Sequence, residues 1–272
     1  MQLALKRPVD PRYPTNKALL VVLAAVLGGS VLYRLVSGAP LLGAVYWAGR
    51  AGAAVFVAWA VARELDPDHP MSAFVAAALM LAAVILLPTP VLLLSFLLIF
   101  VARTINRTVG LPAHALDAIL TLMLLWYVWQ GYAIVGLALV VMFLLDGLLS
   151  EPNRRHLGLA VPSAVVLLAS IAAQRVTGAA SLERPWIAAL GAVSLLFVPV
   201  IASSARVSSI GDVTSVPLDP RRVQAAQILG VLVALGTAIV GGPRGAIALL
   251  PWWSAVAGVG LYRVYAIVAA RR

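Results

Sequence analysis

Long apolar runs, each about the length of a membrane helix, alternate with short polar segments along the whole chain. The runs lack the strict apolar-polar alternation of a lipid-facing strand, so the pattern predicts helices and not a barrel. Helix-ending residues separate them, as at 37–40, 88–90 and 241–243. The predicted spans are residues 18–36, 44–62, 71–87, 89–102, 113–129, 131–148, 157–174, 185–203, 222–240 and 245–268. We therefore expect an all-α, polytopic integral membrane bundle of about ten transmembrane helices.

Composition supports this class. Hydrophobic residues make up 62% of the chain and charged residues 11%, with a mean hydropathy of +1.01, whereas soluble domains are roughly half apolar and about a quarter charged. The absence of cysteine excludes disulfides, thiolate metal sites and thiol nucleophiles. The net charge of +10 does not indicate nucleic-acid binding, because no segment is long enough to form a soluble domain with a basic face.

The basic residues predict how the chain crosses the membrane. With the N-terminus inside, most of them fall on one side: Lys6, Arg7, Arg12, Lys17, Arg63, Arg103, Arg107, Arg154, Arg155, Arg206, Arg221, Arg222, Arg263, Arg271 and Arg272. The opposite side receives only Arg34, Arg50, Arg175, Arg184 and Arg244. The positive-inside rule then places both termini in the cytoplasm, with the protein integral to the plasma (inner) membrane. Setting the orientation of the chain in the membrane is sufficient to explain why basic residues occur at Arg221 and Arg222.

Matched motifs indicate an internal duplication. The segment "LDPDHP" at Leu65 recurs as "LDPRRV" at Leu218, and Pro90 and Pro243 follow at the same distance from them. We therefore expect a parallel tandem repeat, with predicted helices 1–4 equivalent to helices 7–10 about an axis along the membrane normal. The predicted units are a first four-helix repeat at 1–110, a two-helix insert at 111–150 and a second four-helix repeat at 151–272.

Acidic residues gather in two loops that the repeat makes equivalent. The stretch "ARELDPDHPMSAF" contains Glu64, Asp66 and Asp68, and the later loop contains Asp212 and Asp219. If the repeats pack about a twofold axis, these loops approach each other at the cytoplasmic end. The alternative is structural, because Asp68 and Asp219 stand where helices are predicted to begin and can cap them.

The acids of these loops resemble those of intramembrane prenyltransferases of the UbiA type, and "RELDPD" is similar to part of their first aspartate-rich motif. The resemblance covers only the two loops, and the asparagine-aspartate start of that motif is absent. It implies that Glu64, Asp66, Asp68, Asp212 and Asp219 hold Mg2+ against an isoprenoid diphosphate. Mg2+ is the only cofactor that the sequence suggests, and it is expected only if the protein is an enzyme that acts on such a diphosphate.

A second polar group lies at the cytoplasmic ends of predicted helices. His114 and Asp117 are three residues apart and share one helix face. Asp146 ends a span, and an acid so close to the hydrocarbon is expected to be buried or to pair with Arg103 or Arg107. The candidates for a substrate or ion path are His114, Asp117, Asp146, Arg103, Asn106 and Arg107. For His114 and Asp117 the alternatives are a purely structural pair, and metal binding or catalysis.

Two further features depend on where helices begin. If the second helix begins near Tyr46, Arg50 lies in its first turn and extends outward to the interface, whereas a start at Leu41 puts the charge nearer the midplane. We favour the start near Tyr46. Trp252 and Trp253 fall near a predicted outer end and are interpreted as part of an interfacial belt.

Three functions fit these features. No phosphate loop, H-E-x-x-H zinc motif or G-x-S-x-G elbow occurs in the sequence. We expect a transporter or flippase for a small or lipid-linked solute, because tight spans leave room only for a path or pocket inside the bundle. The alternatives are an enzyme acting on an isoprenoid diphosphate or phospholipid headgroup at the cytoplasmic face, and an accessory subunit of a membrane complex. Membrane lipids are the expected partners, with a homo-oligomer or a membrane-complex partner left open.

Overall fold

A computed structural model of the protein describes residues 9–109, 133–173 and 181–270. The described residues form helices and contain no strand, apart from a single bridge between Ile210 and Pro217. The helices are α1 (Pro14–Val36), α2 (Leu41–Leu65), α3 (Ser72–Leu86), α4 (Leu92–Asn106), α6 (Ala133–Leu148), α7 (Arg154–Ala173), α8 (Arg184–Ser203), η1 (Ser204–Arg206), α9 (Pro220–Ala248) and α10 (Leu250–Ala269). The all-α prediction is confirmed for this part of the chain.

Several helices have the length and composition of membrane spans. Five of them are long and apolar enough to cross a membrane: α1, α2, α8 with η1, α9 and α10. The outer face of α1 carries Val21, Leu32 and Val36, which are 65%, 63% and 81% exposed. Apolar surface of this extent is stable against lipid chains and not against water. The protein is therefore a membrane-embedded helical bundle.

Three apolar helices are shorter than a typical span. Helices α3 and α4 have 15 residues each and α6 has 16, so they rise about 22–24 Å at 1.5 Å per residue. A hydrocarbon core is about 30 Å thick. The predicted span 113–129 lies outside the described residues. The count of ten spans therefore stays a prediction.

The predicted break at 241–243 is confirmed, because two helical segments meet there across a residue that is not helical. Gly242 has φ 59° and ψ −147°, a conformation that is essentially limited to glycine. Pro243 follows without a backbone N–H, so the helical ladder is interrupted there. A short second segment follows to Ala248 and turns back on the first, since a Cβ on Gly245 would lie 2.1 Å from the Thr237 carbonyl oxygen; α10 then begins at Leu250.

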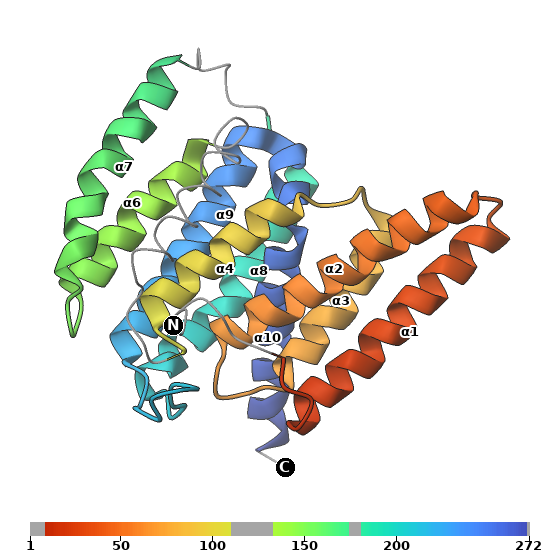
Figure 1. The fold of residues 1–272 in the computed structure, drawn as a ribbon, viewed down its shortest axis with the longest axis horizontal. Coiled ribbons are helices and arrows are strands. Elements are labelled where there is room, and N and C mark those ends of the chain that lie inside the picture. Colours follow the sequence, from red (N-terminus) through yellow and green to blue (C-terminus); the bar gives the residue numbers. More distant parts are fainter. Residues whose placement is uncertain (1–8, 110–132, 174–180, 271–272) are drawn as a thin grey trace.

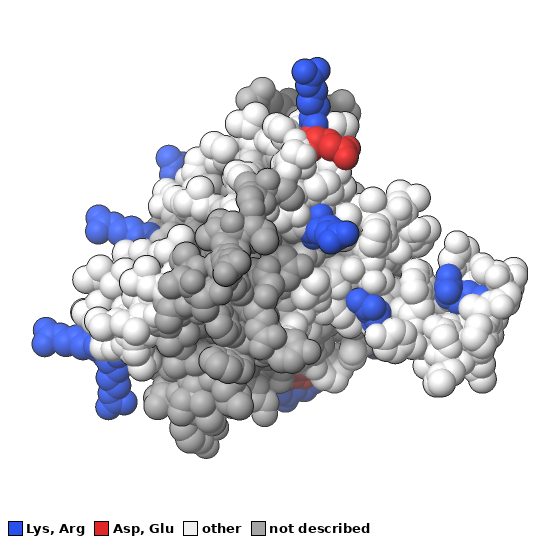
Figure 2. Space-filling view, turned by 90° about the horizontal axis from the view of Figure 1, so that it is seen from above, with Lys and Arg blue, Asp and Glu red and all other residues white. Residues whose placement is uncertain are grey.

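The connections between helices lie at two ends of the bundle. In Figure 1, residues 66–71, 107–109, 149–153 and 204–219 lie at what we call the lower end, and residues 37–40 and 87–91 at the upper end. This arrangement agrees with the predicted alternation of loops. Viewed from above, the charged side chains in sight are mostly Lys and Arg, stand apart from one another and are accompanied by few Asp or Glu atoms (Figure 2).

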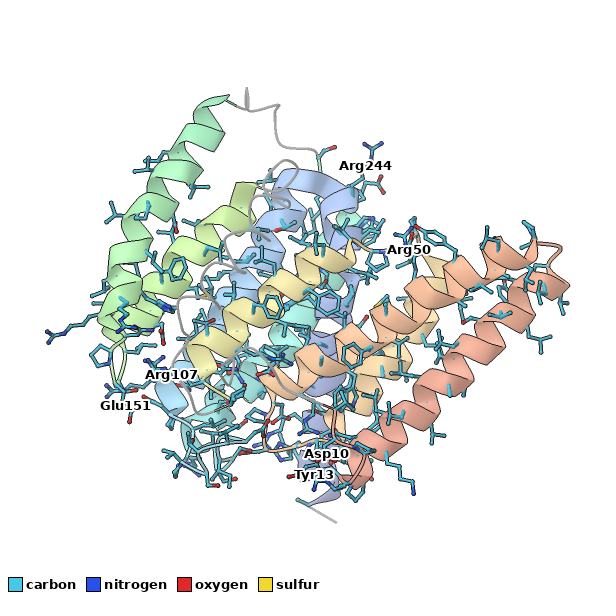
Figure 3. All side chains as sticks on the ribbon, viewed as in Figure 1. Asp10, Tyr13, Arg50, Arg107, Glu151 and Arg244 are labelled. Carbon is cyan, nitrogen blue, oxygen red and sulfur yellow. The ribbon has the colours of Figure 1, made fainter. Side chains whose placement is uncertain are left out.

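Arg50 lies at the upper end although α2 begins earlier than predicted. The helix begins at Leu41 and not near Tyr46, directly after Pro40, which is the N-cap in extended conformation. Arg50 Nη2 donates to the Pro90 carbonyl at 3.5 Å, and the guanidinium lies over the Tyr46 ring. Figure 3 shows Arg50 beside the α3–α4 connection. The helix start was wrongly predicted, but the charge reaches an end of the bundle as expected.

Helix α10 occupies the centre of the bundle. It packs against α3, α8 and α2, while α1 packs on α2 and α7 on α6. In the predicted repeat, α3 corresponds to α9 and α4 to α10, so the contact of α3 with α10 is equivalent to the contact of α4 with α9, and both are present. The predicted repeat also makes α1 equivalent to α7 and α2 to α8, but α1 packs on α2 whereas α7 packs on α6. The tandem repeat and its unit boundaries are therefore not confirmed and stay a prediction.

We expect Gly258→Ala to destabilise the protein by about 1–3 kcal/mol. A Cβ on Gly258 of α10 would lie 2.5 Å from the backbone nitrogen of Ala76 in α3, so one helix would have to move away. The matched control is Gly191→Ala in α8, where nothing lies within 4 Å of the added atom. The thermal unfolding midpoint in detergent should fall for the first variant and stay constant or rise for the second. Equal midpoints would contradict the close α3–α10 packing.

Candidate functional site

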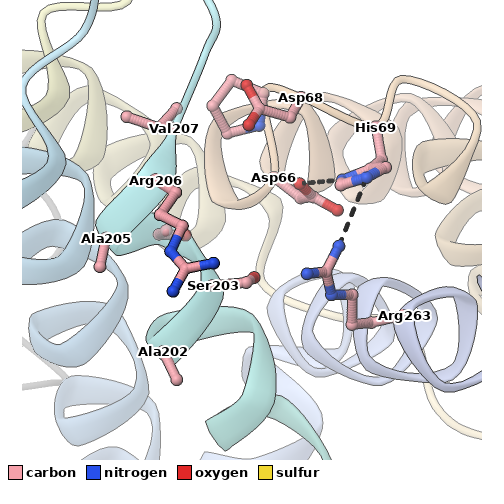
Figure 4. A pocket seen from close by; sticks show the side chains of 11 residues that line it. Asp66, Asp68, His69, Ala202, Ser203, Ala205, Arg206, Val207 and Arg263 are labelled. Atoms are coloured by element: carbon pink, nitrogen blue, oxygen red, sulfur yellow. Dashed lines mark hydrogen bonds and ion pairs between the residues drawn. The ribbon is translucent and has the colours of Figure 1, made fainter. Parts of the chain in front are cut away.

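A polar cavity of about 390 Å3 opens at the lower end of the bundle (Figure 4). Its walls come from the α2–α3 loop, the end of α8, η1 and one residue of α10. The residues around it are Asp66, Pro67, Asp68, His69, Ala202, Ser203, Ser204, Ala205, Arg206, Val207 and Arg263. Segments far apart in the chain therefore build one site.

A chain of three polar side chains lines one wall of this cavity. His69 Nδ1 lies 2.9 Å from Asp66 Oδ1, and Arg263 Nη1 lies 3.4 Å from His69 Nε2 (Figure 4). A guanidinium has no acceptor, so a neutral His69 accepts at Nε2 and donates its Nδ1 proton to the carboxylate. Asp66 thus fixes the orientation and the tautomer of the imidazole.

Asp66 is the buried acid of the site. It is 7% exposed, and its Oδ2 forms no hydrogen bond with any described residue. Burial raises the pKa of its carboxyl above the usual range, although the hydrogen bond with His69 acts in the opposite direction. A carboxyl with these properties can exchange a proton nearer neutral pH than an exposed aspartate can.

Asp68 has a structural role and connects the two acidic loops. Its carboxylate accepts hydrogen bonds from Ser208 N at 3.1 Å, and from Ser209 N at 2.8 Å and Ser209 Oγ at 2.6 Å. Burial alone would raise the pKa of Asp68, but these hydrogen bonds outweigh it and lower the pKa. The two loops meet through this contact, although the twofold packing that would bring them together is not confirmed.

Basic side chains face the cavity from two elements. Arg206 belongs to η1 and Arg263 to α10, and both guanidinium groups point into the space between these elements (Figure 4). Arg206 forms no ion pair with any described residue, whereas Asp68 is already occupied by the loop that it holds. The cavity therefore offers free donors to an anion.

A second polar cluster forms around Asp146 inside the bundle. Its Oδ1 accepts from Arg107 Nη2 at 3.0 Å and from Arg222 Nη1 at 2.8 Å, and the carboxylate is fully buried. His156 Nδ1 lies 2.8 Å from Oδ2, close enough for an ion pair but without hydrogen-bond alignment. The predicted pairing of Asp146 with Arg107 is confirmed. Arg222 and His156 were not predicted as partners, because only the tertiary fold brings α9 and α7 to α6.

A third cluster joins α2 to α4 next to the cavity. Glu64 is fully buried and accepts from Arg103 Nε at 2.8 Å and from Thr108 Oγ1 at 2.7 Å. Asn106 Nδ2 donates to the Glu64 carbonyl at 2.9 Å. Arg103 and Asn106, two candidates for a substrate path, thus hold the end of α2 in place.

The carboxylates of four of the five acids assigned to Mg2+ have separate hydrogen-bond partners. Glu64, Asp66 and Asp68 have the partners given above. Asp219 caps α9 by accepting from Arg221 N at 2.8 Å and also accepts from Ser150 Oγ, and the Asp212 N–H donates to the Thr108 carbonyl. Among the described residues, no group of three or more His, Cys, Asp or Glu side chains is placed to hold a metal ion. His114 and Asp117 lie outside the described residues.

Comparison with protein-family models, with curated proteins and with solved structures found no match to this chain. Its function is therefore inferred from the geometry of the described residues.

The opposite pKa shifts of Asp66 and Asp68 predict opposite effects of pH. The folded protein holds the Asp66 proton more tightly than the unfolded chain, so the stability that this proton confers is lost as pH rises through the raised pKa. Asp68 contributes stability above its ordinary pKa that is lost as pH falls through the lowered one.

We therefore expect Asp66→Asn to be more stable than the wild type at neutral pH and Asp68→Asn to be less stable. Thermal unfolding between about pH 4 and pH 8 in detergent measures both. The difference between Asp66→Asn and the wild type should grow with pH across this range. A difference that does not change with pH would show that Asp66 keeps its ordinary pKa.

Proposed function

We propose that the protein transports or flips an anionic small or lipid-linked solute, and that the polar cavity at the lower end is its binding site. The observation that carries this proposal is the placement of Arg206 and Arg263 around one cavity, beside the His69 imidazole. Guanidinium groups bind phosphate and carboxylate groups with two parallel hydrogen bonds. In a chain with few charged residues, such a grouping favours an anion-binding role.

The proposed orientation follows from the positive-inside rule. The lower end carries the loops that the sequence assigns to the cytoplasm, so the cavity would open to the cytoplasm in the inner membrane. The described helices leave no room for a separate soluble domain, which favours a function carried out within the bundle. Asp66 supplies a titratable group at the site, which supports proton exchange during the transport cycle.

One observation favours a second candidate function. The acidic loops meet at Asp68, and the Asp66–His69 pair holds an oriented imidazole at the edge of the cavity. An enzyme acting on an isoprenoid diphosphate or a phospholipid headgroup would use such an imidazole as a general base when Arg263 turns to the substrate and frees Nε2. Product formation that depends on Mg2+, from a long-chain isoprenoid diphosphate, would favour this alternative.

Transport is tested with the purified full chain in phosphatidylcholine vesicles that carry a trace of NBD-labelled phosphatidylglycerol. Dithionite bleaches the label in the outer leaflet, so the rate of complete bleaching reports flipping. A parallel arm measures uptake of radiolabelled inorganic phosphate. We expect the protein to accelerate at least one of the two processes about tenfold or more over protein-free vesicles, as 1.4 kcal/mol or more of barrier reduction would.

The variant Arg206→Gln/Arg263→Gln should lose most of this acceleration, because glutamine cannot supply the positive charge. The matched control is Arg154→Gln/Arg155→Gln, two exposed arginines at the start of α7 that do not line the cavity. Retention of full activity by the cavity variant, or equal losses in both variants, would exclude the cavity as the binding site. Equal thermal unfolding midpoints verify that the variants are folded.

A further inference from the structure

An apolar groove of about 580 Å3 lies between α3 and α10. Its lining residues are Met71, Phe74, Val75, Ala78, Leu261, Tyr262 and Tyr265. Met71, Leu261 and Tyr265 are 53%, 46% and 68% exposed, so the groove belongs to the outer surface of the bundle. This surface faces the lipid in a membrane-embedded protein.

The groove and the polar cavity are neighbours. The rings of His69, which lines the cavity, and Tyr262, which lines the groove, have centroids 6.0 Å apart. Arg263 follows Tyr262 in α10 and faces the cavity, while Tyr262 and Tyr265 form a ring pair at 6.3 Å. Tyrosine side chains with an apolar body and a polar tip are typical of the boundary between lipid chains and headgroups.

We propose that the two features bind a single anionic lipid, with its phosphate in the cavity and one hydrocarbon chain in the groove between α3 and α10. This inference rests on the proposed function and specifies its substrate as lipid-linked. Charge complementarity supports it. Arg206 and Arg263 meet the phosphate, whereas the carboxylates of Asp66 and Asp68 in the same cavity are held by His69 and Ser209. The groove offers only apolar and aromatic surface. A free inorganic anion would use the cavity alone and would leave the groove without a role.

The position of the site also suits lipid entry. A lipid in the surrounding leaflet reaches the groove from the side, because the exposed residues of α3 and α10 border the hydrocarbon. Its headgroup then meets the cavity at the end of the same two helices without the chain leaving the apolar phase. The cost of moving a charged headgroup through hydrocarbon is avoided in this binding step.

Photo-crosslinking tests this proposal directly. The full chain is placed in phosphatidylcholine vesicles with a trace of phosphatidylglycerol that carries a diazirine in one acyl chain, irradiated, and mapped by peptide mass spectrometry. We expect labels on the α3 and α10 segments that contain Phe74 and Tyr265, about tenfold more than with a diazirine phosphatidylcholine probe, which corresponds to 1.4 kcal/mol of selectivity. An excess of inorganic phosphate should not abolish the labelling.

Two variants separate headgroup binding from chain binding. Arg206→Gln/Arg263→Gln should reduce labelling by phosphatidylglycerol to the phosphatidylcholine level. Ala78→Trp should fill the groove, since Ala78 is an exposed small residue on its wall, and should reduce labelling by both probes. Three results would each overturn the proposal. The two probes could label the groove equally, or Ala78→Trp could leave the labelling unchanged. Neither probe could label the groove, because a second copy of the chain covers it.

The outcome is distinguishable from that of the transport experiment. Phosphate uptake without labelling of the groove would refute the lipid as substrate and leave the proposed transport of an anion in place. Selective labelling without flipping or uptake would establish the lipid site and refute the transport function.

Discussion

Asp146→Asn is expected to lower the free energy of unfolding by about 3–5 kcal/mol, because it removes the negative partner of buried cations. Arg107 and Arg222 are 8% and 2% exposed, and both donate to the same carboxylate oxygen. The amide of asparagine keeps the size of the side chain but cannot neutralise either charge. Reversible unfolding in mixed detergent measures the change.

The matched control for this variant is Glu151→Gln. Glu151 Oε2 also lies near Arg107, at 3.5 Å from Nη1, but the glutamate side chain is 85% exposed. Exposed ion pairs contribute about 0–1 kcal/mol, so Glu151→Gln should have little effect. A similar loss in both variants would show that net charge, and not the buried network, stabilises this region.

A second variant tests whether the cluster acts as a unit. Adding Arg222→Met to Asp146→Asn removes one of the unpaired cations, so the double variant should be more stable than the sum of the two single changes predicts. The expected coupling free energy is about 0.5–3 kcal/mol. Strict additivity would mean that Asp146 and Arg222 stabilise the fold independently, in spite of the 2.8 Å contact.

Glu64→Gln has the second largest expected effect, about 3 kcal/mol. The carboxylate is fully buried between α2 and α4, and its charge balances that of Arg103, which is 13% exposed. Glutamine removes the negative charge that Glu64 places beside the Arg103 guanidinium, and its uncharged amide accepts more weakly from the Thr108 hydroxyl. The loss should appear in the same unfolding measurement.

Glu183→Gln serves as the control for Glu64→Gln, because Glu183 is exposed and its side chain forms no capping hydrogen bond at the start of α8. The control should remain within about 0.5 kcal/mol of the wild type. If Glu64→Gln has an equally small effect, the Glu64–Arg103 contact does not hold α2 against α4.

The outline of the fold could be predicted from the sequence because apolar length and helix-ending residues act locally. The ends of α3 and α8 lie within one residue of the predicted bounds. The break predicted at residues 241–243 is present too, because Gly242 leaves the helical conformation and Pro243 lacks a backbone N–H. Local patterns were insufficient for the short segment between Pro243 and Ala248, because its position depends on packing that is not visible in the local sequence.

Tryptophan positions illustrate the same limit. Trp252 and Trp253 were predicted to form an interfacial belt but are 1% and 5% exposed. Trp252 packs on α9 at Gly230, where an added Cβ would lie 2.0 Å from its ring. An aromatic residue near a helix end faces lipid or protein according to which helix packs beside it, so composition alone could not decide between the two.

The sequence by itself determined the class of protein, the helical fold of the described residues and the pairing of Asp146 with an arginine of the preceding region, since a buried acid near hydrocarbon requires a cation. Only the tertiary structure decided that Arg222 shares that carboxylate and that Asp68 joins the two loops. It alone also brought Arg206 and Arg263 to one cavity beside an apolar groove. The reason is physical: helix periodicity and hydropathy act between near neighbours, whereas these contacts join residues that only the packing of separate helices brings together.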